Sequence, residues 1–215
     1  MATLASDERN IIEAEDFNWR LVAYPIIAIV ALLLIGFGIY YYELNQREQA
    51  EEAAAAALTA AKTQADIVKV ADSYPETTQA AVALMRAADL SVAAKDFDNA
   101  KKDYQRVLDS KQAPVELRDS AQLGLAGVQE ANGDVDNAIQ SYLVIAQKGG
   151  ASPFAAVAYH QVAAIYASRQ DKVHEQQILQ QEVRLGGDSP FVKEAADRLK
   201  ELTPETAATA TNAAP

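Results

Sequence analysis

The residue types that most often carry catalysis or bind metals are few in this sequence and poorly placed for either task. The chain has no cysteine, which excludes a thiol nucleophile, a disulfide framework and a cysteine-ligated metal. Its two histidines, His160 and His174, fall on different expected helices and have no Asp, Glu or His partner at the spacing of a metal site. No serine lies in a GxSxG setting. We therefore expect no catalytic residue, no metal and no cofactor, and predict that the protein is not an enzyme.

A pair of glycines, Gly124 and Gly127, is the nearest approach to a phosphate-binding loop. Both fall in the middle of an expected helix, whereas a phosphate loop joins a strand to the start of a helix. We interpret the pair as a place where two helices pack closely.

Composition and charge narrow the class of protein further. The 215 residues include 19 Lys and Arg against 30 Asp and Glu, a net charge of −11, so a basic nucleic-acid-binding surface is not expected. Alanine, the strongest helix former, accounts for 44 residues, whereas there are only 9 Gly and 7 Pro. These numbers favour an all-α chain.

One segment has the length and composition of a membrane-spanning helix. Leu21–Tyr42 contains 22 residues and no charge, and as a helix it would be about 33 Å long, enough for a hydrocarbon core of about 30 Å. Aromatic residues lie at both ends, Trp19 and Tyr24 at one and Tyr40–Tyr42 at the other, as at membrane interfaces. A cleaved signal peptide fits less well, because the apolar run is too long and an acidic leader precedes it.

The orientation of this segment rests on a weak signal. The basic residues near its two ends are equal in number, but Arg20 is directly adjacent to the span. We therefore expect a single-pass protein of a bacterial inner membrane with a cytoplasmic N-terminus and a periplasmic C-terminal part.

The rest of the chain contains internal repeats. KDFDNA at Lys95–Ala100 returns as GDVDNA at Gly133–Ala138, 38 positions later, and a tyrosine follows each copy at the same distance, Tyr104 and Tyr142. A second motif recurs 37 positions apart, as GGASPF and GGDSPF, at Gly149–Phe154 and Gly186–Phe191. Each copy predicts a helix start, with serine as the cap and proline in the first turn.

Apolar spacing between short polar turns predicts a series of helices. They lie near residues 46–72, 78–94, 97–110, 115–132, 135–148, 154–169, 172–185 and 190–202. The expected parts are an N-terminal tail (1–20), a transmembrane helix (21–42), a linker or packing helix (43–75), a domain of paired helices (76–202) and a disordered tail (203–215). The last helix would cap the stack with a polar outer face made by Lys193, Glu194, Asp197, Arg198 and Lys200.

A helix, a GD-type turn and a second helix with small residues at fixed places resemble the tetratricopeptide repeat. Aligned on Ala100 and Ala138, the family's packing positions hold Leu84, Ala87, Ala88, Tyr104 and Val107, then Leu125, Ala126, Gly133, Tyr142 and Ile145. A third copy would use Tyr159, Val162, Ala163, Tyr166 and Leu179. It departs from the pattern at Glu175, where a small residue is expected, and at Gln170, in place of the turn glycine. The repeats are also 37–38 residues long instead of 34.

The resemblance implies a helical-hairpin solenoid whose first helices line a protein-binding groove. The groove residues would be Val82, Met85, Asp89, Val92, Leu123, Gly127, Glu130, Val157, His160, Ala164 and Ser168. Met85 and Leu123 are best suited to hold a peptide or helix. The alternative is that these residues pack against helix 46–72 or the tail of the same chain.

The whole plan resembles the bacterial family of ancillary subunits of the SecYEG translocon, in architecture, length, acidity and repeats. The resemblance implies a membrane-anchored scaffold that links the translocon to periplasmic chaperones, with translocon subunits, chaperones or exported chains as partners. Membrane lipid would contact residues 21–42, no nucleic acid would bind, and a homo-oligomer is possible. The alternative is an envelope scaffold for cell division or outer-membrane assembly, whose repeats often begin with a YPxSxxA-like sequence similar to Tyr74–Ala80.

Overall fold

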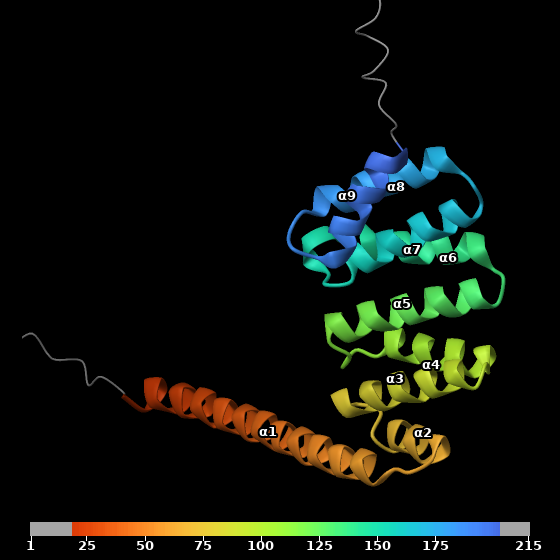
Figure 1. Ribbon diagram of the computed structural model, residues 1–215. Coiled ribbons are helices and arrows are strands. Elements are labelled where there is room, and N and C mark those ends of the chain that lie inside the picture. The colour runs from red at the N-terminus through yellow and green to blue at the C-terminus, as the bar shows by residue number, and fades with distance from the viewer. Residues whose placement is uncertain (1–18, 203–215) are drawn as a thin grey trace, which may run out of the picture. The chain divides into compact units, whose positions relative to one another are not determined.

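The computed structural model describes residues 19–202 and contains nine α-helices, one short 3-10 helix and no strand in that range (Figure 1). The helices are α1 (Trp19–Ala60), α2 (Gln64–Ser73), α3 (Thr78–Ala93), α4 (Phe97–Asp109), α5 (Val115–Ala131), α6 (Val135–Ala146), η1 (Gly149–Ala151), α7 (Ala155–Ser168), α8 (Lys172–Leu185) and α9 (Pro190–Leu202). The all-α prediction is confirmed. The predicted tails, up to residue 18 and from residue 203, lie outside the described residues.

The described chain falls into two units, one ending at Gln46 and one beginning at Arg47. The first consists of the apolar part of α1, where every side chain from Tyr24 to Gln46 is exposed. This is the one helix of the described residues that is long and apolar enough to cross a membrane.

The helix expected over residues 46–72 is instead two helices, because the chain has a strong helix start at Thr63. The Thr63 hydroxyl accepts the Asp66 N–H at 3.2 Å, and Asp66 Oδ2 accepts the Thr63 N–H at 3.1 Å. This capping box starts α2, which is therefore a separate helix from α1. The Thr63 hydroxyl also donates to Asp66 Oδ2 at 2.8 Å, and this bond, followed by that from the Thr63 N–H, lowers the pKa of the exposed Asp66 carboxyl.

The end of α1 and α2 together form a helix pair that the sequence analysis did not identify as one. Ala54 and Leu58 of α1 are buried in one cluster with Ile67 and Val70 of α2 and with residues of α3. Glu51 joins α1 to α3 directly, because its carboxylate oxygens accept the N–H groups of Thr78 (2.6 Å) and Gln79 (3.3 Å) at the start of α3.

Three further pairs follow, α3 with α4, α5 with α6 and α7 with α8, and each turns at a residue with positive φ. These residues are Lys95 (60°), Gly133 (84°) and Gln170 (58°). A left-handed conformation is easiest for glycine but open to other residues at a modest cost. Gln170 therefore makes the same turn as Gly133, and the departure at this position leaves the hairpin unchanged.

The residue after each turn is an aspartate that begins the second helix of the pair. Asp96 accepts the Asn99 N–H at 3.3 Å and Asp171 accepts the His174 N–H at 3.2 Å, while Asp134 accepts the Asn137 side-chain amide at 2.9 Å. The turn and an N-cap aspartate therefore recur in all three pairs, although Asp134 accepts no backbone N–H of its helix.

The register of the third pair is maintained in spite of Glu175. This residue is 2% exposed, like the fully buried Ala100 and Ala138 at the equivalent places. Its carboxylate accepts a hydrogen bond from Arg198 Nε of α9 at 2.8 Å. The charge is therefore buried together with a partner, as the environment of a buried carboxylate requires.

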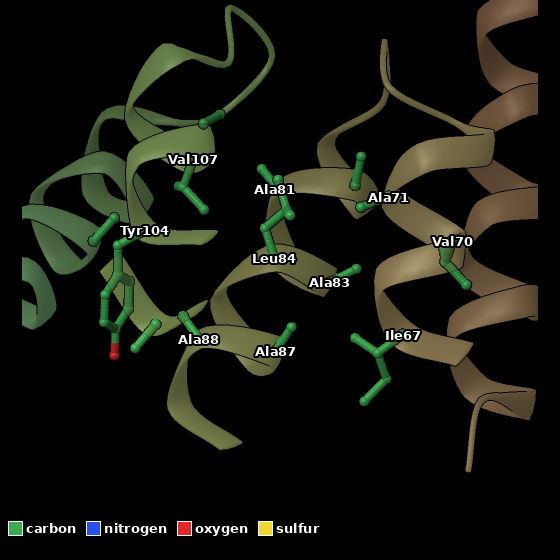
Figure 2. Close-up of a cluster of buried hydrophobic side chains, with 14 of the residues drawn as sticks. Ile67, Val70, Ala71, Ala81, Ala83, Leu84, Ala87, Ala88, Tyr104 and Val107 are labelled. Carbon is green, nitrogen blue, oxygen red and sulfur yellow. The ribbon is translucent and has the colours of Figure 1, made fainter. Parts of the chain in front are cut away.

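The pairs stack on buried small and apolar residues (Figure 2). Tyr104 and Val107 of α4 lie opposite Leu84 and Ala88 of α3, and on the other side α3 contacts Ile67 of α2. Close packing of α4 and α5 depends on Gly124, where an added Cβ would lie 2.7 Å from Tyr104 Cε1. The predicted packing role of this glycine is confirmed.

The two GG-x-SPF segments begin their helices differently. Pro190 is the first residue of α9, as predicted. In the first copy, however, Gly149–Ala151 forms the 3-10 helix, the Ser152 hydroxyl accepts the Phe154 N–H at 3.3 Å, and α7 begins only at Ala155. Ser152 therefore holds a turn before the helix and is not its cap.

Helix α9 closes the stack as the predicted terminal helix. It buries Val192 and Ala195 against the last pair, whereas the five charged residues predicted for its outer face are all exposed. A polar outer face of this kind ends a stack without leaving an uncovered apolar surface.

Candidate protein-binding surface

The predicted groove residues lie on the first helices of the three pairs, α3, α5 and α7. Five are exposed (Val82, Asp89, Val92, Ala164 and Ser168), and six are half-buried (Met85, Leu123, Gly127, Glu130, Val157 and His160). Val82 and Val92 are 37% and 36% exposed. This set, called here the first-helix face, remains the candidate surface for a partner.

Two apolar residues of the first-helix face pack against the hydrophobic core on their inner side. Met85 packs against the cluster that contains Ala54 and Leu58, and Leu123 packs against the cluster of the second and third pairs. Each side chain also keeps part of its surface exposed. A supported, partly exposed Met or Leu can anchor an apolar side chain of a partner without a large rearrangement.

The two acids of the first-helix face are held by tyrosines of the second helices. Tyr104 donates its hydroxyl to Asp89 Oδ1 at 2.6 Å, and Tyr142 donates to Glu130 Oε2 at 3.0 Å. Burial of each phenol, together with the adjacent carboxylate, raises the pKa of both tyrosines. These bonds fix the carboxylates at the surface and leave them able to accept further hydrogen bonds.

The third-pair end of the surface differs from the prediction, because α9 covers part of it. The His160 ring lies 5.1 Å from the Phe191 ring of α9, centroid to centroid. His160 and Ala164 line a hollow of about 220 Å³ with residues of α8 and α9, among them Leu179, Glu194 and Arg198. At this end, therefore, part of the first-helix face already has an occupant within the chain.

Behind His160 lies a residue that the sequence analysis missed, Glu182. It is fully buried, and neither carboxyl oxygen has a hydrogen-bond partner. Its Oε1 lies 3.7 Å from His160 Nδ1, which is also unpartnered. Burial, and secondarily the negative charge of Glu194, raises the pKa of Glu182 to about 8. The sequence did indicate this burial, because Glu182 lies four residues after Ile178 and three after Leu179 and therefore falls on the same apolar face of the helix.

The residues considered for chemistry remain apart. His174 Nδ1 lies 2.6 Å from Asp171 Oδ2 at the exposed start of α8, and its ring stacks on Tyr166. Within residues 19–202, no group of three or more His, Asp or Glu side chains could hold a metal ion.

Comparison with known proteins gives one match. A family described as tetratricopeptide repeat-like domain matches residues 18–152. That range runs from the start of α1 through α6 and ends after η1, so it includes the apolar segment and two of the three predicted pairs. No curated protein matches the chain.

Proposed function

Because the chain belongs to the tetratricopeptide repeat-like domain family, we propose that it is a membrane-anchored, non-catalytic scaffold that binds other proteins through its first-helix face. Repeat domains of this kind typically act through protein contacts. The observation that carries the proposal is the exposure of Val82 and Val92 beside the half-buried Met85 on one helix of the stack. Apolar side chains at this spacing can contact one face of a partner helix or an extended segment.

We further propose that α1 anchors the chain in a bacterial inner membrane, with a cytoplasmic N-terminus and periplasmic repeats. In this arrangement the repeats would serve as an accessory factor of protein export, linking the translocon to periplasmic chaperones. The support is the likeness in architecture, length and acidity to the ancillary translocon subunits. The rival role, in cell division or outer-membrane assembly, requires the same anchor and the same face but different partners.

The first-helix face can be tested by charge placement. The double variant Met85→Glu and Leu123→Glu should reduce capture of partners several-fold, because each new carboxylate must be desolvated on contact. The matched control is Val144→Glu with Val173→Glu, on the second helices, where the two valines are 55% and 64% exposed. Equal capture by both double variants, with unchanged helix content, would remove the face from consideration.

The identity of the partner can be tested by a photo-crosslinking amino acid at Val82 or Val92 in living cells. Translocon subunits or periplasmic chaperones among the crosslinked proteins would support the export role. Division or outer-membrane assembly proteins would support the rival role.

Topology can be tested separately, since the chain has no native thiol. A single cysteine is introduced by Ser6→Cys or by Ser73→Cys, the latter at an exposed position, and intact cells are labelled with a membrane-impermeant maleimide. Labelling at 73 and not at 6 is the expected result. The reverse pattern would place the repeats in the cytoplasm and end the export proposal.

A further inference from the structure

Glu182 is the most unfavourably placed charged group of the described residues. A fully buried carboxylate normally has an ion-pair partner or several hydrogen-bond donors. The two other buried carboxylates with close cationic partners show the usual solution, Glu175 with Arg198 and Asp119 with Lys148. Neither Glu182 oxygen has a hydrogen-bond partner, and the His160 Nδ1 atom lies 3.7 Å from Oε1.

The groups that face this site come from three helices. Helix α7 provides His160, and α9 provides Glu194, whose negative charge opposes ionisation of Glu182. The cation that α9 brings to this end, Arg198, donates instead to Glu175 of α8 at 2.8 Å and to Glu201 at 2.9 Å. Arg198 is therefore already paired with two carboxylates and does not balance a charge on Glu182.

Helix α9 contacts the histidine that lies beside this acid. Phe191 packs on the His160 ring, and Ala195 is buried in a small cluster with Ala163 and Leu179. Leu199 and Leu202 of α9 pack against the same cluster, together with Ile178 and Val183 of α8. A negative charge on Glu182 would act against the negative charge of Glu194 on α9 and so disfavour docking of the helix.

We propose that α9 is a proton-controlled cap, which stays docked while the Glu182 carboxyl holds a proton and detaches when that proton is lost to water. Detachment would uncover Leu179 and Ala163 and free His160 and Ala164, extending the first-helix face at its third-pair end. This inference stands apart from the proposed function, because it concerns only the coupling of one acid to one helix.

The direction of the pH effect follows from linkage. The pKa of Glu182 is about 8 with α9 docked, against 4.5 for an ordinary glutamate. Stabilisation of the docked state is therefore complete below pH 4.5 and is lost as the pH rises towards 8. Within this window the docking equilibrium changes about tenfold per pH unit, which is about 30-fold from pH 5.5 to 7.0.

The test is hydrogen exchange of the full chain in a mild detergent, followed by mass spectrometry at pH 5.5 and 7.0. Dividing each observed rate by the intrinsic rate at that pH leaves a protection factor. We expect the protection of α9 to fall about 30-fold over this step while that of α3 stays constant. In Glu182→Gln the fall should disappear, and in the matched control Asp197→Asn, which changes an exposed acid of α9, it should persist.

Two results would overturn the proposal. One is α9 protection in the unmodified chain that does not depend on pH, and the other is an undiminished fall in a folded Glu182→Gln variant. If Glu182→Gln lost protection in α3 as well, it would not be folded, and the profile of the unmodified chain would decide the question alone. The result is independent of partner capture, so failure here and failure of the scaffold proposal can be distinguished.

Discussion

The contact between Gly124 and Tyr104 allows a quantitative test of how the second pair packs on the first. Gly124 lies in the middle of α5, and an added Cβ would come within 2.7 Å of Tyr104 Cε1 and 2.8 Å of its hydroxyl oxygen. Such distances are well inside van der Waals contact, so Gly124→Ala must displace the ring or separate α4 from α5. Forcing one extra carbon into a packed core costs about 1–3 kcal/mol.

Helix propensity changes the stability in the opposite direction, so a control variant must account for it. Replacing glycine by alanine inside a helix stabilises by about 1 kcal/mol. Gly127 lies one turn further along α5, and a Cβ there would be 3.5 Å from the Tyr142 hydroxyl oxygen, an ordinary contact. Gly127→Ala therefore gains the propensity without the clash, and the difference between the two variants isolates the clash at about 1–3 kcal/mol.

The assay is thermal unfolding of each full-length variant in the same detergent, followed by circular dichroism. We expect Gly127→Ala to melt at or above the unmodified chain and Gly124→Ala to melt several degrees below Gly127→Ala, at about 2–4 °C per kcal/mol. In a Tyr104→Leu background, Gly124→Ala and Gly127→Ala should differ much less, since the ring causes the difference. Equal melting temperatures for the two alanine variants would refute the packing argument.

Two further predictions concern the anchor and a buried ion pair. Leu33→Arg should weaken membrane retention, because a charge at mid-bilayer costs about 2.5–3.5 kcal/mol, and fractionation identical to that of Leu33→Ala would count against a span at this segment. Lys148→Met should destabilise the repeats by about 1–3 kcal/mol in denaturant unfolding, because it leaves the Asp119 carboxylate, which is 1% exposed, without its cation. The control is Lys101→Met, which removes an exposed lysine. Equal unfolding midpoints for the two variants would show that the ion pair contributes nothing to stability.

Much of the fold could be predicted from the sequence because the information is local. Seven of the eight predicted helices begin and end within about two residues of their expected bounds, and the exception is 46–72, which continues from α1 and is broken before Thr63. Turn, cap and small residue recur at Lys95–Ala100 and Gly133–Ala138, and each acts within a few residues of itself. The break at Thr63 was also local, since its signal was the capping box with Asp66, but alanine-rich helical spacing on both sides obscured it.

Only the tertiary structure decided the roles of residues that form contacts between helices. The sequence by itself determined the three helix pairs from α3 to α8 and the apolar segment, and it predicted the residues of the first-helix face. It could not show that Glu51 caps α3, that Arg198 pairs with Glu175, or that α9 covers His160. Each of these contacts joins residues at least 20 positions apart, so it depends on how whole helices stack and not on the spacing within any one of them. For the same reason, the sequence places Glu182 on an apolar face of its helix but cannot show that it is buried without a hydrogen-bond partner, because that depends on the neighbouring helices.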